Sequence, residues 1–279
     1  ALLAELQPDE HALVQGLDTD RQTVARTRRR LQETGRYGTV SADTWNGETL
    51  PYTDNLINLL VAAEPEKAAR GELMRVLAPN GVLLEKRGDR WARTIKPWPD
   101  ALDEWTHYLH GPDGNPVADD TAVGPPERLQ WVGGPAWARH HDHMASMTSC
   151  VSAGGRVFYI MDEGPTASIQ LPSKWRLVAR DGFNGAILWK RTIPKWNTRQ
   201  YPLKSGPAHL LRRLVAVGDR VMVTLGIDAP VSVLDAATGE TLQQLDGSEH
   251  TREIVISDGT AFLVADEANS RLPEFRRVS

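Results

Sequence analysis

The sequence predicts two joined parts of different fold class, an α/β part built on a partial doubly wound sheet and then an all-β part. Three observations lead to this prediction. Helix and strand signals alternate over the first ninety residues, prolines interrupt the chain after Arg93, and a short turn motif recurs farther on. A chain of 279 residues is long enough for two domains.

The first part opens with alternating elements. The expected elements are the end of a helix at 1–6, a strand at 11–17, a helix at 21–34 and a strand at 37–42. The side chain of Asp20 is expected to cap the amino end of the helix at 21–34. Gly35 follows its carboxyl end, where a residue in the left-handed conformation is preferred. The order is that of an α/β sheet.

The same alternation continues to about residue 90. Residues 56–61 are almost wholly apolar, which predicts a strand buried on both faces. A helix at 66–77, a turn at 78–81 and a strand at 82–86 are expected next.

The composition changes after Arg93. Six prolines punctuate this stretch and exclude a regular helix: Pro97, Pro99, Pro112, Pro116, Pro125 and Pro126. The strand signals that follow are short and separated by Gly and Asp turns, and no amphipathic helix is evident. The remainder is therefore expected to be all-β.

A repeated turn motif organises this second part. Its residues are Asp181, Asn184, Gly185 and Trp189 in the first copy and Asp235, Thr238 and Gly239 in the second, 54 residues later. Asp and Asn or Thr bond their own turn, Gly takes a positive φ, and Trp packs between neighbouring sheets. Gln243 stands where the second Trp is expected. Strands are expected before each copy at 154–159 and 217–223, and again at 257–263.

These segments resemble two known families. GLDTD, SAD, DNLINLLV and MRVLAPNGVLLEK are similar to the second to fifth strands of class I S-adenosylmethionine methyltransferases, which have a Rossmann-like sheet. The repeat, with the lead-in DEWTH at 103–107, resembles pyrroloquinoline-quinone-type β-propellers, and the combination is similar to fusions in planctomycete-like bacteria. The resemblance implies a methyltransferase-like domain at 1–92, a linker and lead-in at 93–126, and the first propeller blades at 127–279.

Both parts lack pieces that the families have. The methyltransferase-like part has neither the first strand nor the glycine-rich loop that follows it, and 127–279 holds about three or four blades, whereas such propellers have more. We therefore expect the chain to be a fragment of a longer protein.

The resemblance implies a cofactor site in the first part. An acidic residue after the second strand of this family binds the ribose hydroxyls of S-adenosylmethionine, and one after the third lies near adenine. Asp18 and Asp43 occupy these places, and Thr19, Thr44 and Asp54 are further candidate contacts of the cofactor. The alternative is that these residues only cap turns and helices. No catalytic residue is identified.

The second part contains the densest group of metal-ligand side chains, His140, His141 and His143. One interpretation is a metal or substrate site, and His107 and His110 lie not far before this group in the sequence. The alternative is that the imidazoles form structural hydrogen bonds in a tryptophan-rich junction. Pyrroloquinoline quinone is not expected, because Cys150 is the only cysteine and no vicinal disulfide can form. Trp175, Trp189 and Trp196 are more simply packing residues.

Composition limits the partners. The net charge of −4 gives no general attraction for nucleic acid, and no apolar run approaches the roughly 20 residues that span a bilayer. The expected partners are a small-molecule cofactor in the first part and a protein or polymer at the propeller.

The resulting hypothesis is a methyltransferase-like domain fused to a propeller that supplies a binding surface, with an unknown methyl acceptor. The alternatives are a noncatalytic envelope scaffold and a quinoprotein dehydrogenase. Propellers of this kind are commonly exported, which favours the periplasm or cell envelope, whereas methyltransferases are usually cytoplasmic.

Overall fold

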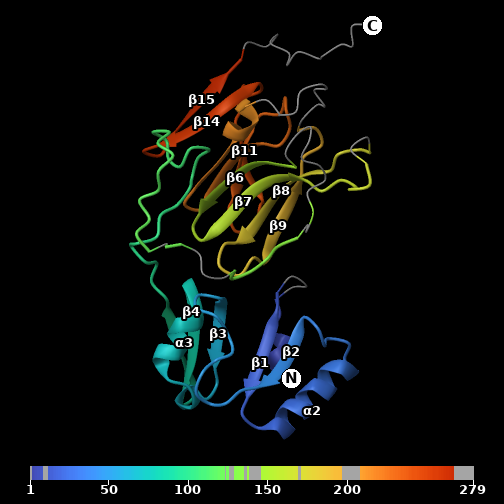
Figure 1. The fold of residues 1–279 in the computed structure, drawn as a ribbon, viewed down its shortest axis with the longest axis vertical. Coiled ribbons are helices and arrows are strands. Elements are labelled where there is room, and N and C mark those ends of the chain that lie inside the picture. Colours follow the sequence, from blue (N-terminus) through green and yellow to red (C-terminus); the bar gives the residue numbers. More distant parts are fainter. Residues whose placement is uncertain are drawn as a thin grey trace. The chain divides into compact units, whose positions relative to one another are not determined.

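The computed structural model describes residues 2–8, 12–122, 124–125, 129–134, 137, 146–168, 171–196 and 208–266. The chain forms two compact units, which are described separately (Figure 1). The first comprises Ala1–Asp100 and Arg128–Trp131, and the second comprises Ala101–Glu127 and Val132–Ser279. The expected domain limits at residues 92 and 126 stay a prediction, because they mark changes in composition and not in packing.

The first unit begins with a parallel strand-helix-strand motif. Its elements are α1 (Leu2–Glu5), β1 (Val14–Asp18), α2 (Arg21–Glu33) and β2 (Val40–Thr44). Asp20 caps α2 by accepting hydrogen bonds from the backbone N–H groups of Gln22 and Thr23, and Gly35 follows the helix with a φ of +67°. β1 and β2 are paired in parallel.

The second strand lies later in the sequence than expected. It was predicted at 37–42 and spans Val40–Thr44. Gly38 has a φ of +133°, which turns the backbone out of the extended region, so a continuous strand forms only after it.

A three-stranded sheet completes the first unit. Its elements are β3 (Ile57–Ala62), the 3₁₀ turn η1 (Pro65–Lys67), α3 (Arg70–Val76), β4 (Leu77–Arg87) and β5 (Arg90–Ile95). β3 and β4 are parallel, and β4 and β5 form an antiparallel hairpin.

Three details of this sheet differ from the prediction. The helix is shorter than 66–77, because Pro65 opens a 3₁₀ turn and Ala68 is extended before α3 begins. The expected turn at 78–81 lies inside β4, where Asn80 has a φ of +62°. The hairpin strand β5 was not predicted, because its charged residues hide the alternation.

The expected burial of the third strand on both faces is wrong. Leu60 and Ala62 pack against the core, but Leu59 is 48% exposed. β3 is an edge strand, and α3 covers only one face of its sheet in the described part of the chain.

The two sheets of this unit are not hydrogen-bonded to each other within the described residues. A shared core holds them together: Leu17 of β1 and Trp45 after β2 pack against the buried cluster of Leu50, Leu73, Val76, Leu77 and Leu83. Parallel strand pairs are therefore present, but they do not form one continuous doubly wound sheet.

The second unit is built from antiparallel sheets, which confirms its all-β class. The first sheet contains β6 (Met147–Ala153), β7 (Arg156–Asp162), β8 (Trp175–Asp181) and β9 (Ile187–Thr192). The second contains β10 (Leu214–Val217), β11 (Arg220–Thr224), β12 (Val231–Asp235) and β13 (Thr241–Gln244). The third contains β14 (Thr251–Ser257) and β15 (Thr260–Ala265), and a 3₁₀ segment, η2 (Ala208–Arg213), precedes β10.

Consecutive sheets share apolar cores. Phe158, Trp189 and Leu177 of the first sheet pack with Val221 and Leu234 of the second. A smaller cluster formed by Val215, Met222, Val231 and Ile254 joins the second sheet to the third. Each sheet therefore buries one face against the next.

The lead-in segment touches all three sheets. The carbonyl of Trp105 accepts from Ser152 N at 2.7 Å, and the carbonyl of Thr106 accepts from Ala216 N at 3.0 Å. Ile256 N donates to the imidazole Nε2 of His107 at 3.0 Å. Three successive residues thus bond β6, β10 and β14, the first strand of each sheet.

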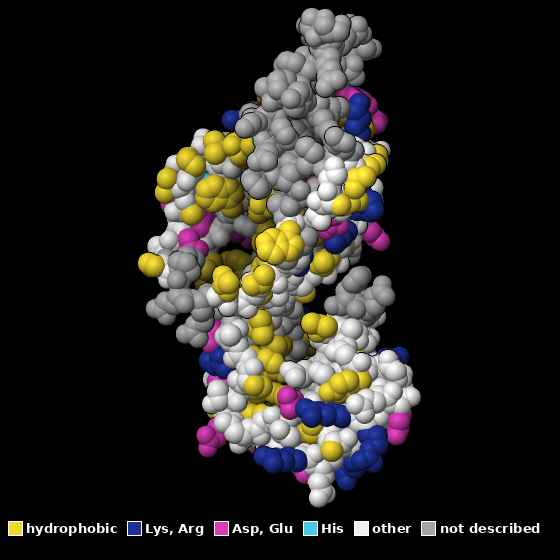
Figure 2. All heavy atoms as spheres, turned by 45° about the vertical axis from the view of Figure 1, so that its right-hand side comes forward, with side chains coloured by type: hydrophobic (Ala, Val, Ile, Leu, Met, Phe, Trp, Pro, Cys, Tyr) yellow, Lys and Arg dark blue, Asp and Glu magenta, His cyan; other side chains and the backbone are white. Residues whose placement is uncertain are grey.

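Apolar side chains also remain at the surface, as Figure 2 shows for one face. Among the described residues, no helix is long and apolar enough to cross a membrane.

Candidate functional site

The carboxyl ends of β1 and β2 lie side by side. Asp18 is the register partner of Thr44, and Leu17 is that of Asp43. The backbone N–H of Trp45 donates to the carbonyl of Asp18 at 3.2 Å. Three residues predicted to contact a cofactor, Asp18, Asp43 and Thr44, therefore lie together at one edge of a parallel pair.

Asp18 and Asp20 have different tasks. Asp18 Oδ1 accepts from the backbone N–H of Asp20 at 3.0 Å, which closes the turn into α2. The hydroxyl of Thr23 and the backbone N–H of Gln22 donate to Asp20, and these hydrogen bonds lower its pKa. Asp20 is a helix cap, whereas Asp18 lies at the end of the strand.

Thr19 faces the loop after β2. A Cβ atom at Gly47 would lie 3.5 Å from Cγ2 of Thr19, and Gly47 has a φ of +83°. The loop thus turns directly beside Thr19.

A basic residue that the sequence analysis missed lies within electrostatic reach of Asp18. Lys67 belongs to η1, which follows β3, and its ammonium bonds Glu64 at 2.5 Å. This hydrogen bond raises the pKa of Lys67, and the charge of Asp18 adds to the effect. We call Asp18, Asp43, Thr44 and Lys67 the carboxyl edge. The Glu-x-x-Lys spacing was the only sequence signal for Lys67.

Asp43 is held by α2. Its Oδ1 accepts from Arg28 at 2.8 Å and from Thr44 N at 2.8 Å, while Arg28 Nε donates to the carbonyl of Ala42 at 2.8 Å. The two charged side chains are 41% and 52% exposed, so the pair contributes little to stability. Asp43 nevertheless connects α2 to the strand β2 through this contact.

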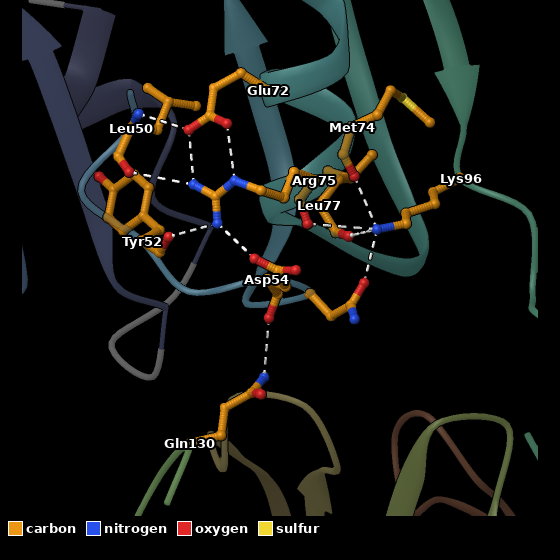
Figure 3. Close-up of polar contacts among 10 residues, drawn as sticks. Leu50, Tyr52, Asp54, Glu72, Met74, Arg75, Leu77, Lys96 and Gln130 are labelled. Carbon is orange, nitrogen blue, oxygen red and sulfur yellow. Dashed lines mark hydrogen bonds and ion pairs between the residues drawn. The ribbon is translucent and has the colours of Figure 1, made fainter. Parts of the chain in front are cut away.

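Asp54 contacts α3 instead of the carboxyl edge (Figure 3). It precedes the amino end of β3, and its Oδ1 accepts from Arg75 at 2.6 Å. Arg75 also donates through two nitrogens to Glu72, at 2.6 and 2.8 Å. No contact joins Asp54 to Asp18 in the described part of the chain.

The Arg75 network is a clamp between a loop and a helix. Glu72 Oε1 accepts from Leu50 N at 2.7 Å, and the carbonyls of Leu50 and Tyr52 accept from Arg75 at 3.3 and 2.9 Å. The hydrogen bonds from Arg75 lower the pKa of Glu72 to about 2, and those from Glu72 and Asp54 raise the pKa of Arg75. The role is structural. Its sequence signal was the Glu-x-x-Arg spacing in α3.

Tyr52 connects the same loop to β1. Its hydroxyl donates to Gln15 Oε1 at 2.7 Å. Burial, with a smaller contribution from the charge of Asp43, raises the pKa of Tyr52 to about 12. The phenol therefore stays protonated at neutral pH and acts as a donor.

Lys96 closes the carboxyl end of α3 (Figure 3). Its ammonium donates to the carbonyls of Met74 and Leu77 at 2.8 and 2.7 Å and to Asn55 Oδ1 at 2.7 Å. Burial lowers its pKa. Also in the first unit, Gln130 Nε2 donates to the carbonyl of Asp54 at 3.2 Å.

The repeated turns of the second unit are stabilised by their own side chains. Asp181 Oδ1 accepts from the backbone of Phe183 and Asn184 at 2.8 and 2.9 Å, and Gly185 has a φ of +74°. In the second copy, Asp235 Oδ1 accepts from Ala237 and Thr238 at 2.9 Å each.

Trp189 joins the two copies. Its Nε1 donates to the carbonyl of Ala236 at 3.0 Å, and its ring lies against Gly239, where a Cβ would approach it to 2.5 Å. The motif residues thus lock one sheet to the next.

The predicted metal ligands His140, His141 and His143 all lie outside the described residues. Within the described ranges, no group of three or more His, Cys, Asp or Glu side chains is arranged to hold a metal ion. His107 accepts from Ile256 N, and His110 Nε2 bonds Asp103 Oδ2 at 2.7 Å.

The second unit also has a hollow of about 480 Å³ beside its first sheet. Arg180 is buried there and donates to Tyr159 Oη, to the carbonyl of Gly185 and to that of Gly134. Lys190, which also lines the hollow, bonds Glu163 at 2.7 Å. The sequence analysis did not identify this hollow, because the motif residues alone carry no sign of it.

Comparisons with known proteins add little. The chain matches no family model and no curated protein. The cyclase SpnF aligns at 26% identity over 31% of this chain and 39% of its own, with a TM-score of 0.25. A europium-containing methanol dehydrogenase aligns at 13% identity over 57% of this chain and 27% of its own, with a TM-score of 0.36. The matched parts cover less than half of SpnF and less than half of the methanol dehydrogenase.

Proposed function

We propose that the first unit binds the nucleoside part of S-adenosylmethionine at the carboxyl edge, as a portion of a doubly wound methyltransferase-like domain. The second unit then presents consecutive propeller blades as a rigid surface for a protein or polymer. The observation that carries the proposal is the position of Asp18, at the carboxyl end of β1 beside Thr44. Ligands of open α/β sheets bind at the carboxyl ends of the strands.

The chemistry of Asp18 fits a ribose. A carboxylate has two oxygens with about four lone-pair sites, and the turn into α2 uses Oδ1 for a single hydrogen bond. The carboxylate of Asp18 can therefore accept hydrogen bonds from two adjacent sugar hydroxyls. Lys67 lies within electrostatic reach of Asp18, but its ammonium is already paired with Glu64.

S-adenosylmethionine, when bound, supplies an activated methyl group. The contribution of the chain's own residues is to orient the ribose through Asp18, beside the loop that turns next to Thr19. Holding the reactants in the correct orientation in this way accelerates methyl transfer. The acceptor would be chosen by the second unit.

A noncatalytic scaffold is the second candidate, and a specific observation favours it. Asp43 and Asp54, two of the residues expected to face the cofactor, are bound to Arg28 and Arg75. Carboxylates bound to arginine in this way have fewer oxygens free for a cofactor, which leaves Asp18 as the principal acidic contact.

Calorimetric titration of S-adenosylmethionine and S-adenosylhomocysteine into the full chain separates the two functions. We expect micromolar binding that Asp18→Asn weakens by about tenfold or more. Asparagine keeps an acceptor for Asp20 N, so the turn into α2 should stay closed. The matched control is Asp89→Asn, in the exposed turn between β4 and β5, which should change the affinity by less than about twofold.

Two results would contradict the proposal. One is the absence of a binding heat for a chain whose circular dichroism and melting show a folded protein. The other is binding that Asp18→Asn and Asp89→Asn alter equally. Either result leaves the scaffold as the better description.

A further inference from the structure

The sheet β3-β4-β5 has two unlike faces. Leu83 and Glu85 of β4 point to the covered face and are buried, whereas their neighbours Val82 and Leu84 point the other way. The register places Leu59 beside Val82 and Val82 beside Ile95. The second face, which we call the open face, consists of Leu59, Val61, Val82, Leu84, Trp91 and Ile95.

The open face is apolar and accessible. Leu59 of β3 is 48% exposed, and Trp91 and Ile95 of β5 are 47% and 46% exposed; Val82 and Leu84 of β4 lie between them. Single exposed apolar residues are ordinary on protein surfaces, but a contiguous group marks an interaction site. The apolar sequence of β3 on both faces is the pattern of a strand that is covered twice.

Positive charge borders this apolar surface. Lys86 is the register partner of Trp91, and Arg93 is that of Leu84, so both cations project from the open face. Within the described residues, neither takes part in an ion pair. A second copy of the chain would add its own Lys86 and Arg93 to the interface, and these like charges disfavour self-association.

The dimensions suit one helix. Five residues of a strand, from Val82 to Lys86, extend about 16 Å, which a helix of about 11 residues matches. Helices are the elements that pack on the faces of parallel strands, and they bind through apolar residues at every third or fourth position.

We propose that the open face binds an amphipathic helix of a partner polypeptide, with leucine-like residues on the contact stripe and acidic residues along its borders. The apolar stripe covers Leu59, Leu84 and Trp91, and the acidic residues pair with Lys86 and Arg93. This site is separate from the carboxyl edge and does not depend on cofactor binding.

Fluorescence anisotropy with a labelled synthetic peptide tests the proposal. The peptide has about 14 residues, leucines at helical spacing and flanking glutamates; a second peptide carries lysines instead of glutamates. We expect saturable binding of the acidic peptide to the full chain. Trp91→Ser and Arg93→Glu should each weaken it about tenfold or more, and Arg93→Glu should improve binding of the basic peptide.

Matched controls define the site. Phe262→Ser removes an aromatic side chain of similar exposure from β15, and Arg29→Glu reverses a charge on α2; both should leave the affinity within about twofold. Ile95→Ser, on the same face, replaces Trp91→Ser if that variant does not fold.

Three outcomes would overturn the inference. The first is that the folded chain shows no saturable binding of the acidic peptide. This outcome includes the case in which the chain binds phosphatidylglycerol vesicles through Trp91 instead. The second is binding that the open-face variants do not change. The third is a concentration-dependent dimer that Trp91→Ser abolishes.

Discussion

The imidazole Nε2 of His107 accepts a hydrogen bond from the backbone N–H of Ile256 at 3.0 Å, across a sequence separation of 149 residues. The other nitrogen, Nδ1, lies 2.7 Å from Thr106 Oγ1, which itself donates to the carbonyl of His110. These contacts assign the ring proton to Nδ1, because an accepting Nε2 must be unprotonated. The lead-in is thereby joined to β14 by a neutral histidine.

This contact predicts acid sensitivity. Burial lowers the pKa of His107 from 6.5, so the unfolded chain takes up the proton at a higher pH than the folded chain does. The contribution of His107 to the free energy of unfolding should therefore be fully present above about pH 6.5 and should decrease as the pH falls below that value. Urea denaturation at several pH values measures the decrease.

His107→Gln is the variant that tests this assignment. It has no titrating group at this position, so its stability should depend less on pH between about 5 and 7. An unchanged pH dependence in this variant would show that another group is responsible.

Gly239 is expected to tolerate no side chain. Gly239→Ala places a Cβ against the ring of Trp189 at a φ of +73°, and should lower the free energy of unfolding by about 2 kcal/mol or more. Gly259→Ala is the control, because Gly259 has the same φ of +73° and open space around it, and should cost only about 1 kcal/mol. Equal losses in urea denaturation would argue against packing at Trp189.

Arg75 should be more sensitive to substitution than its partner Asp54. Arg75→Met leaves Glu72 without its main partner and should lower the free energy of unfolding by about 2 kcal/mol. Asp54→Asn should cost about 0.5 kcal/mol, since the Asp54 side chain is 69% exposed. Denaturation followed by circular dichroism compares the two.

The same network predicts resistance to acid. The pKa of Glu72 is lowered to about 2 from 4.5, so its contribution is present above about pH 4.5 and is lost only as the pH falls through about 2. Arg75→Met should therefore remain less stable than the native chain at pH 4. Equal stability at that pH would contradict the proposed ion pair.

Lys96 is expected to stabilise α3 through its ammonium. Lys96→Met removes the donor for the carbonyls of Met74 and Leu77 and should cost about 1 to 3 kcal/mol. Lys86→Met, at an exposed position of β4, should change stability by less than about 0.5 kcal/mol. A loss of similar size in both variants, measured by thermal melting, would show that the helix end does not need Lys96.

Local chemistry made some elements predictable and hid others. The cap at Asp20 and the stop at Gly35 place α2 within one residue, because each acts on its own turn. β5 escaped prediction, since the charges of Arg90 and Arg93 mask its alternation. The helix at α3 was overestimated because the extended residue Ala68 separates it from the 3₁₀ turn at Pro65.

The candidate site was predictable in part, because the ends of strands can be recognised from local sequence. Asp18 and Asp43 could be placed at strand ends from the sequence, and β1 and β2 do end together. Their partners could not, because Arg28 and Lys67 reach them only through folding. Asp54 was expected beside the cofactor, but it contacts Arg75 and Gln130.

The sequence by itself determined the change from an alternating α/β part to an all-β part and the turns at Asp181 and Asp235, since these depend on residues close together in the chain. Only the tertiary structure decided which acidic residues became ion-pair partners and which face of β3 stayed open. It also decided that Trp105, Thr106 and His107 bond three separate sheets. The physical reason is that such contacts join residues far apart in sequence, so that no local pattern encodes them.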